Sequence, residues 1–232
     1  MYSHHPLLRW LIGYEAQRKR VLARAPEGPL KHFLSQPFPS PNTPLSEVKI
    51  LSVDFETTGL DAIKDKLLSV GYVEMCHQQI KLSTCYHKII NTQKALSPDN
   101  VAIHQIMDEQ KSQGATLKEV LDNLLEALAG KVMLVHFARI ERQFLQRACL
   151  EVYGLVPPLA IIDTLVLAKR QLDKRDIAYD PSQLRLSALR HSHQLPEYFA
   201  HNALNDAIAT AELLLAQLAT MHDSVTLERV LL

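Results

Sequence analysis

The order in which β-rich and helical segments follow one another constrains the fold of this chain most. From Val48 on, three β-rich runs lie close enough in sequence to pair as an antiparallel meander: VKILSVDF, KLLSVGYVEM and QIKLSTCYHKII. Two later apolar runs, VMLVH and LAIID, each lead into a helical pattern, as the strands of βα units do. This order predicts an α/β fold with a mixed five-stranded sheet, in which two parallel strands join the meander and helices flank the sheet.

The segment before this pattern is predicted to be an N-terminal helical extension. The stretch LLRWLIGYEAQRKRVLARA is compatible with a helix that has one apolar face and several basic residues. The next stretch, PEGPLKHFLSQPFPSPNTP, holds six prolines and is expected to be an extended linker. We therefore predict a basic helix and proline-rich linker over residues 1–46, the main domain over 47–220 and a C-terminal tail over 221–232.

The composition argues against several function classes. The seven glycines form neither a GxxxxGK[ST] nor a GxGxxG sequence, which disfavours P-loop and dinucleotide-binding functions. Cys76, Cys85 and Cys149 form no CxxC pair, so we expect reduced cysteines in a cytoplasmic protein rather than disulfides or a zinc site. The net charge is zero, and no apolar run approaches the ~18 residues of a membrane helix. Any nucleic-acid affinity must therefore come from a local site, and no membrane association is expected.

Two carboxylates end a buried strand in the sequence DFETTGL. Asp54 and Glu56 are two residues apart, so on a strand they would project from the same face. Two like charges in such a place are unfavourable unless cations or protons neutralise them, which indicates a divalent metal ion. Gly59 would permit a tight turn that brings the amides of Thr57 and Thr58 close to a ligand. The alternative is that both carboxylates cap the next turn.

A further carboxylate opens the last long helical pattern, in the sequence HNALNDA. His201 and Asp206 are five residues apart and would diverge on a continuous helix, so they converge only if His201 precedes the helix. Asn202 is a suitable N-cap for a helix that starts there. Taken alone, the pattern also fits an aspartate that the helix macrodipole stabilises.

Together these motifs resemble those of the DEDDh-type 3′→5′ exonucleases, the DnaQ-like group of the ribonuclease-H-like superfamily that includes the polymerase III proofreading subunit. The resemblance covers about residues 47 to 218. The first motif, DFETTGL, matches residue for residue, and HNALNDA matches the third in spacing and flanking alanines. The segment ALSPDNVAIHQI also resembles the family segment that places a histidine, here His104, near the substrate.

The second motif departs from the family pattern. Family members carry HN followed by a phenylalanine and an aspartate, where this chain reads HFARIERQFL from His136. When VMLVH and the final Phe-Leu are aligned, Glu141 takes the aspartate position and Phe137 the asparagine position. The charge is kept on a longer side chain. Without the alignment, Glu141 would be interpreted as an exposed helix glutamate paired with Lys or Arg.

The resemblance implies a two-metal mechanism. Asp54 would bridge two Mg²⁺ or Mn²⁺ ions. Glu56 and Asp206 would complete the shell of the ion that carries the attacking water, and Glu141 would support the other. His201 would be the general base. The implied substrate-binding residues are Thr57, Thr58, Leu60, His104 and Phe137.

The implied function is metal-dependent 3′→5′ exonuclease activity on single-stranded nucleic acid, with DNA favoured and nucleoside 5′-monophosphates released. One alternative is an exoribonuclease acting on RNA ends or short oligoribonucleotides. Another, motivated by the changed second motif, is a catalytically impaired module that binds nucleic acid or protein. Four basic residues near the motifs are candidates for phosphate contacts, although such charges are usually only solvated: Lys64, Lys66, Arg139 and Arg142.

The N-terminal helix has several possible roles. It could pack against the main domain, dock on a DNA polymerase or another protein, or attract nucleic acid. A mitochondrial targeting segment is a minor alternative. A role in DNA repair or proofreading would follow from a polymerase partner.

Overall fold

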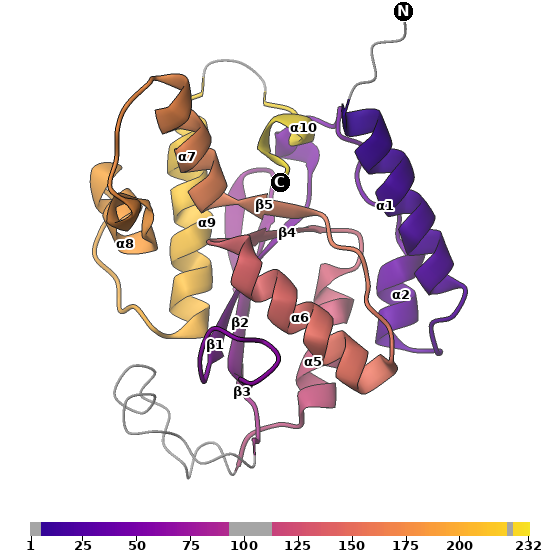
Figure 1. Ribbon diagram of the computed structural model, residues 1–232. Helices are drawn as coiled ribbons and strands as arrows, with labels where there is room; N and C mark the ends of the chain where they lie inside the picture. Colours follow the sequence, from indigo (N-terminus) through magenta and orange to yellow (C-terminus); the bar gives the residue numbers. More distant parts are fainter. Residues whose placement is uncertain (1–5, 93–112, 222–224) are drawn as a thin grey trace, which may run out of the picture.

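A computed structural model describes residues 6–92, 113–221 and 225–232 of the chain. Five strands form one sheet in the order β3-β2-β1-β4-β5 (Figure 1). β1–β3 make an antiparallel meander, and β4 runs parallel to both β1 and β5. The predicted mixed five-stranded sheet is therefore confirmed. The strands are β1 (Ile50–Thr57), β2 (Leu67–Cys76), β3 (Gln79–Ile89), β4 (Val132–Val135) and β5 (Ile161–Asp163).

Helices lie on both sides of the sheet. Figure 1 shows α7, α8 and α9 on one side of the strands and α1, α2, α5 and α6 on the other. Among the described residues, no helix is long and apolar enough to span a membrane. The α-helices are α1 (Pro6–Leu22), α2 (Pro29–Ser35), α5 (Leu117–Leu128), α6 (Ala138–Tyr153), α7 (Thr164–Lys174), α8 (Leu186–Ser192), α9 (Ala203–Ala219) and α10 (Leu227–Val230). Short 3₁₀ turns occur at η1 (Leu45–Glu47) and η2 (Pro181–Leu184).

β1 is covered on both faces, and its two faces differ in chemistry. One face packs into the core that α5 and α6 complete, and it consists of Leu51, Val53 and Phe55. Ser52 lies on the other face, where its hydroxyl donates a hydrogen bond of 2.6 Å to the Ala207 carbonyl of α9. Because side chains alternate along a strand, Asp54 and Glu56 share the face of Ser52. β1 therefore brings both carboxylates towards α9.

α9 approaches β2 so closely that only glycine fits between them. A Cβ atom on Gly71 would lie 2.2 Å from both the carbonyl carbon of Ala203 and the amide nitrogen of Leu204. The N-cap residue of α9 is Asn202, whose side chain accepts hydrogen bonds of 3.2 Å from two amides of the first turn. This contact and the cap together place Asp206, in the first turns of α9, against the sheet.

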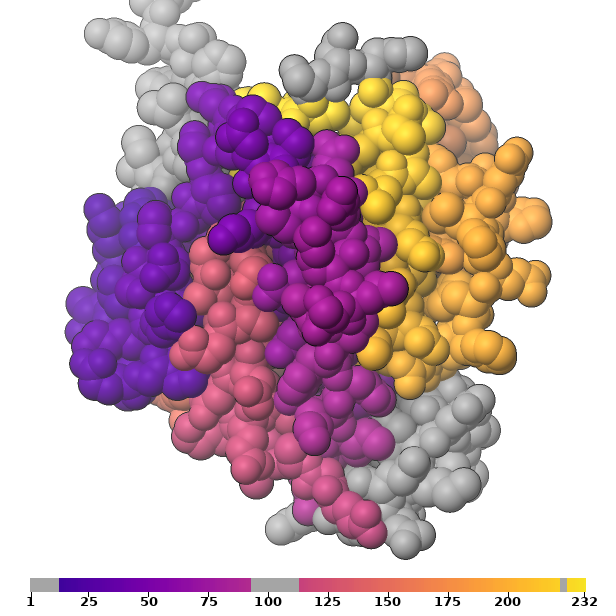
Figure 2. Space-filling view, turned by 180° about the vertical axis from the view of Figure 1, so that it is seen from behind, coloured from indigo at the N-terminus to yellow at the C-terminus, as the bar shows by residue number. Residues whose placement is uncertain are grey.

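Among the described residues, the β3 edge of the sheet is exposed. Most side chains of β3 are exposed or half-buried, whereas those of β1 and β2 are mostly buried. Seen from behind, the β2–β3 region reaches the surface between the N-terminal helices and α9 (Figure 2).

The predicted extended linker is wrong between residues 29 and 35, which form α2. Leu30, Phe33 and Leu34 have helical spacing and are buried in the core beside α5, so the burial of one apolar face outweighs the proline content. Pro29 is compatible with the first turn of a helix because the amide it lacks would have no helical partner there. Arg18 of α1 is buried and donates a hydrogen bond to the Leu34 carbonyl, so α1 packs against α2.

The segments on either side of the predicted 47–220 domain contact each other. The Leu45 amide donates to the Val225 carbonyl at 2.8 Å, and the Leu227 amide donates to the Thr43 carbonyl at 3.0 Å. The final residue, Leu232, donates to a carbonyl of β5. The C-terminal segment is thus hydrogen-bonded both to the chain before β1 and to the sheet.

Candidate active site

Three carboxylates converge at the end of β1. Asp54 and Glu56 come from β1 and Asp206 from α9, and one oxygen of each lies within 4.8 Å of the others. Glu56 is 6% exposed and Asp206 is 8% exposed. Within the described parts of the chain, no other group of three or more His, Cys, Asp or Glu residues has metal-ligand spacing. Oxygen ligands of this kind are those that Mg²⁺ and Mn²⁺ prefer.

Burial and mutual repulsion raise the pKa values of these carboxyl groups. Burial is the main cause of the pKa of Asp54 lying well above its ordinary value, and the neighbouring carboxylates raise it further. Burial also raises the pKa of Asp206 to about 6, against the opposing effect of hydrogen bonds from Tyr198 and from the His201 amide. Such closely placed carboxylates are unfavourable as bare charges, and a bound divalent cation would offset their repulsion.

Glu141 adds a fourth carboxyl group from the first turn of α6. It is 4% exposed, and its Oε2 has no hydrogen-bond partner among the residues described. Burial raises the pKa of Glu141 to about 8, and the charges of Asp163 and Glu56 raise it further. Glu141 is therefore not the exposed, ion-paired glutamate of the alternative interpretation. A buried carboxylate oxygen without a partner fits a cation or a water bound to one.

His201 lies on the loop before α9. Its backbone is left-handed, with φ of 64°, and its amide donates a hydrogen bond of 2.9 Å to Oδ2 of Asp206. The side chain is exposed, yet it is near enough to lower the pKa of Asp206. The main chain of His201 thus holds the carboxylate while the imidazole remains open to solvent.

Tyr198 is a site residue that no sequence motif marks. Its hydroxyl is hydrogen-bonded to Asp206, and burial is the main cause of its raised pKa. The Arg190 guanidinium lies 4.8 Å from the centre of the Tyr198 ring. Arg190 also donates hydrogen bonds to the carbonyls of Ala209, at 2.8 Å, and Pro196, at 2.9 Å. Arg190 therefore ties the loop that carries Tyr198 to α8 and α9.

Asp163 is a second residue that was not predicted. It is 3% exposed at the end of β5, and its Oδ1 accepts hydrogen bonds from the amides of Phe137, at 3.0 Å, and Leu165, at 2.9 Å. Its Oδ2 accepts a bond of 2.8 Å from the amide of Ala138. One carboxylate thus holds the starts of α6 and α7, one turn before Glu141. The only sequence signal is an aspartate placed as N-cap of the pattern TLVLAKRQL.

Thr57 and Thr58, the threonines predicted to contact the substrate, form side-chain hydrogen bonds to the loop of residues 58–66. The Thr57 hydroxyl donates to the Gly59 carbonyl at 2.7 Å. The Thr58 hydroxyl donates to Oδ1 of Asp65 at 3.1 Å and accepts from the Lys66 amide at 3.0 Å. These bonds fix the path of the loop that leaves β1.

Exposed apolar side chains occur on the loops that surround the carboxylates. Leu60 is 74% exposed and Ile63 80% exposed on the loop after β1, and Phe137 is 42% exposed after β4. Phe199, two residues before the histidine, is 89% exposed. Such side chains can contact bases. The predicted substrate residue His104 lies outside the described residues.

A family comparison agrees with this geometry. The RNase T family model, described as "Exonuclease", matches residues 51–214, which run from β1 into α9. The chain belongs to this exonuclease family. The resemblance to DEDDh exonucleases and the prediction of a nuclease enzyme are thereby confirmed.

Two relatives share sequence with the exonuclease domain. The PolC-type DNA polymerase III of Thermotoga petrophila is 33% identical over 165 residues, which cover 70% of this chain and 11% of the relative. The 3′-5′ exonuclease DinG of Staphylococcus epidermidis is 30% identical over 164 residues, which cover 70% of this chain and 17% of the relative. The chain therefore spans less than a fifth of the length of either relative.

Solved exonuclease structures share the fold. The nuclease domain of 3′hExo, a DEDDh family member bound to rAMP, superposes with a TM-score of 0.62 at 16% identity, covering 75% of this chain and 92% of that one. Exonuclease X in complex with 5′ overhanging duplex DNA gives a TM-score of 0.58 at 21% identity, covering 77% of this chain and 95% of that one. Cell-death related nuclease 4 superposes with a TM-score of 0.65 at 14% identity, covering 75% of this chain and 64% of that one.

Proposed function

We propose that this exonuclease domain hydrolyses phosphodiester bonds from the 3′ end of single-stranded nucleic acid, with DNA favoured, and releases nucleoside 5′-monophosphates. The convergence of Asp54, Glu56 and Asp206 within 4.8 Å is the observation that carries the proposal. The relatives support the polarity and the substrate, because one is named a 3′-5′ exonuclease and the other a DNA polymerase.

The four carboxylates fit a site for two Mg²⁺ or Mn²⁺ ions. Asp54, Glu56 and Asp206 would hold one ion, and Asp54 and Glu141 the other. Two such ions supply electrostatic stabilisation for the entering and leaving oxygens of a displacement at phosphorus. The buried Oε2 of Glu141 and the raised pKa values of its neighbours support this assignment.

His201 would take a proton from the attacking water. The water oxygen then forms a bond to phosphorus, and the bond to the 3′ oxygen of the preceding nucleotide breaks. That oxygen leaves and takes up a proton from solvent. The exposed imidazole suits a base that must return its proton to solvent after each turnover. The exposed Leu60 and Phe137 would contact the terminal bases, and the loop bonds of Thr57 and Thr58 would shape this surface.

An exoribonuclease is the second candidate function. It is favoured by solved neighbours that bind rAMP or recognise a histone mRNA stem-loop. The third candidate is a catalytically impaired binding module. The burial of Glu141 argues against it, because this residue differs from the aspartate of the family motif but still adds a carboxylate to the cluster.

The function is tested with end-labelled single-stranded DNA and RNA of matched sequence. With Mg²⁺ or Mn²⁺, the wild-type protein should give a ladder that starts at the 3′ end, and the DNA-to-RNA rate ratio names the substrate. Asp54→Asn keeps the side-chain volume but removes the charge, so this variant should give no ladder. The wild-type protein with a chelator should give no ladder either. Intact strands of both kinds with the wild-type protein would contradict the proposal.

The partner and the cellular role of the protein stay predictions. The polymerase name of one relative supports a DNA polymerase or another protein as partner, with α1 as the contact, and a role in proofreading or repair. A cytoplasmic location also stays a prediction.

A further inference from the structure

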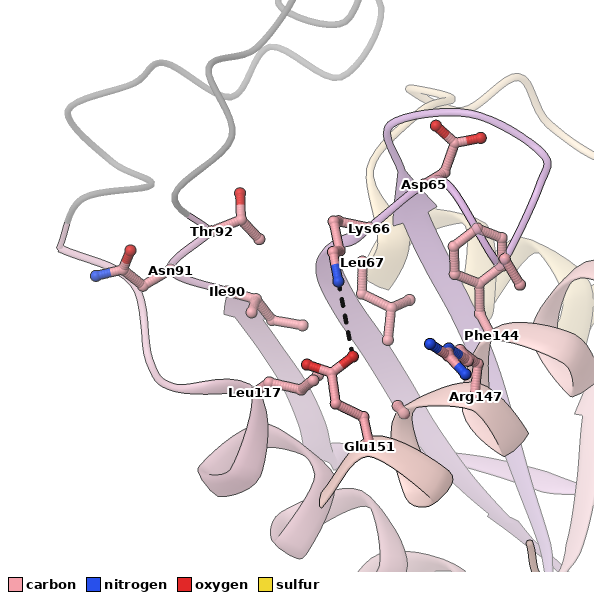
Figure 3. Close-up of a pocket in the computed structure, with 12 residues that line it drawn as sticks. Asp65, Lys66, Leu67, Ile90, Asn91, Thr92, Leu117, Phe144, Arg147 and Glu151 are labelled. Carbon is pink, nitrogen blue, oxygen red and sulfur yellow. Dashed lines mark ion pairs between the residues drawn. The ribbon is translucent and has the colours of Figure 1, made fainter. Parts of the chain in front are cut away.

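A cavity of about 320 Å³ lies beside the loop that leaves β1 (Figure 3). It is bounded by that loop, by α6, by the residues that follow β3 and by the start of α5. A volume of this size is at the lower end of the range for small-molecule sites. None of the residues assigned to the carboxylate cluster lines it. Its lining residues are Ala62, Asp65, Lys66, Leu67, Ile90, Asn91, Thr92, Leu117, Phe144, Arg147, Ala148 and Glu151.

The cavity has an apolar floor and one cation without an anionic partner among the residues that the structure describes. The floor consists of buried side chains, namely Leu67, Ile90, Phe144 and Ala148. At the rim, Lys66 forms an ion pair of 3.6 Å with Glu151. The other acidic group, Asp65, accepts hydrogen bonds from Thr58 and from the Asp61 amide within the loop.

Unlike Lys66, Arg147 forms no ion pair with any residue that the structure describes. Figure 3 shows its guanidinium on the side of α6 that carries Phe144 and Glu151, next to the Lys66–Glu151 pair. An apolar floor beside a guanidinium that has no ion pair with the described residues matches a ligand with a flat apolar part and an anionic group. A nucleotide has both.

α6 connects this cavity to the carboxylate cluster. Phe144, Arg147 and Glu151 follow one another at spacings of three or four residues, so they lie along one side of the helix, and Glu141 lies about one turn before Phe144. The helix rises ~1.5 Å per residue, which places Arg147 about 9 Å along the axis from Glu141. Phosphates on one strand are spaced by ~3.4 Å along a stacked helix, so this distance corresponds to about two or three nucleotides.

We propose that the cavity binds an unpaired nucleotide of the substrate strand, two or three positions upstream of the bond that is cut. Its base lies on the apolar floor and its phosphate contacts Arg147. The inference rests on the proposed nuclease function and narrows its substrate. A base seated in this cavity is not paired with a second strand, so the substrate is single-stranded at that point. A dinucleotide is too short to reach the cavity, so strands of four or more nucleotides are preferred over dinucleotides.

The test compares the affinities of single strands of two and six nucleotides by calorimetric titration. Ca²⁺ replaces Mg²⁺, and recovery of intact strands shows that none is cleaved. In Arg147→Gln, the ratio of hexamer affinity to dinucleotide affinity should fall about tenfold, as expected for loss of one hydrogen bond to a charged group. The salt dependence of hexamer binding should also weaken, by about 0.7 in the slope of log K against log salt concentration.

Two further variants separate a local effect from a general one. Ala62→Trp places a ring at the cavity from the opposite wall and should lower the same ratio without a change of charge. Arg175→Gln removes the same charge from an exposed position at the end of α7 and should leave the ratio unchanged. Thermal unfolding of each variant shows whether it is folded. Equal ratios in wild type, Arg147→Gln and Ala62→Trp would overturn the inference, as would equal affinity of the wild-type protein for both strands.

Failure of the proposed function would be seen in a different measurement. The p-nitrophenyl ester of thymidine 5′-monophosphate has no upstream nucleotide, so its hydrolysis by the wild-type protein reports on the carboxylate cluster alone. No metal-dependent hydrolysis of this ester or of a strand would contradict the nuclease function. The titrations need no cleavage, so they decide the cavity's role in either case.

Discussion

The carboxylate of Asp163 accepts a hydrogen bond of 3.0 Å from the backbone amide of Phe137. This bond joins the end of β5 to the turn that leads from β4 into α6. Phe137 is the N-cap residue of α6 and has a left-handed backbone, with φ of 75°. Its own side chain makes no capping bond, so Asp163 does the capping from another strand. The position of Glu141, one turn later, depends on this contact.

Replacing Asp163 with asparagine should loosen that turn. Both oxygens of the Asp163 carboxylate accept hydrogen bonds from backbone amides. Asparagine has only one acceptor oxygen, so its NH₂ group would face one of these N–H donors and that hydrogen bond would be lost. We expect Asp163→Asn to lose about 1–3 kcal/mol of unfolding free energy in urea. The apparent affinity for Mn²⁺ should also fall, because Glu141 is held less well. Asp173→Asn, an exposed change on α7, is the control. Unchanged stability and unchanged Mn²⁺ affinity would contradict the positioning role.

Replacing Phe137 with asparagine should stabilise the protein. A left-handed backbone is unfavourable for most residues by about 1–2 kcal/mol, and asparagine tolerates it better. We expect Phe137→Asn to gain about 1 kcal/mol of unfolding free energy, and to raise KM if the exposed ring contacts a base. Phe137→Leu, which removes the ring but keeps the strain, should raise KM without the gain. A loss of stability in Phe137→Asn would show that packing of the ring matters more than the backbone.

The carboxylate cluster should make stability depend on pH when no metal is bound. Asp206 and Glu141 have pKa values raised to about 6 and about 8 in the folded protein. A carboxyl group with a raised pKa binds its proton more tightly when folded. The stability that these two groups contribute is therefore fully present below the unfolded pKa of about 4 and is lost as pH rises through the folded pKa.

Chelator-treated protein should accordingly become easier to unfold in urea between about pH 5 and pH 8. Added Mg²⁺ should restore the stability at pH 8, because it replaces the protons as the neutralising charge. In Glu141→Gln the decline should be shallower, since one of the titrating groups is removed. The same slope in wild type and Glu141→Gln would contradict the assignment.

Glu141 should tolerate shortening better than neutralisation. Glu141→Gln removes the charge and should lower kcat by on the order of 10²-fold, with weaker metal binding. Glu141→Asp keeps the charge and should retain activity, with a changed ratio of Mg²⁺ to Mn²⁺ rates. Both are measured on a labelled single strand over a metal titration. Full activity in Glu141→Gln would remove this residue from the site.

His201→Asn is the informative change at the proposed base. Asparagine tolerates the left-handed backbone at this position, and the backbone amide that holds Asp206 is retained. We expect kcat to fall by about 10²–10⁴-fold, with the metal concentration for half-maximal activity unchanged. A parallel loss of metal affinity would indicate that the imidazole supports the carboxylate rather than the proton transfer.

Local patterns in the sequence were sufficient to predict the sheet. The first three strands are β-rich runs and the last two are apolar runs that lead into helices. Asp54 and Glu56 lie near the end of the first run, and the alternation of side chains along a strand places both on one face. α2 was missed because the stretch that contains it holds six prolines, and these masked the helical spacing of the three apolar residues that decide its burial. Proline content describes the chain locally, whereas the stabilisation of α2 comes from α5, which is about 90 residues away in sequence.

The supporting residues of the site could not be predicted for the same reason. Asp163 and Tyr198 act through contacts made across strands and loops, and neither has a motif at fixed spacing from the residue that it supports. Arg147 is likewise one of many helix arginines in the sequence. Only the folded chain shows that it lacks an ionic partner among the described residues and lines a cavity. Sequence motifs indicated the residues proposed to bind metal or react, whereas the residues that position them are recognised only from their contacts in the fold.

The close approach of α9 to Gly71 enlarges the set of positions at which a mutation can disrupt the proposed active site. Every missense change in a glycine codon introduces a side chain, and at this position any Cβ would collide with the backbone at the start of α9. The helix start that would be displaced carries Asp206. If the proposed site is catalytic, a lineage can lose activity through a codon that encodes none of its acidic residues, so inspection of those residues alone would not reveal an inactive copy of the gene.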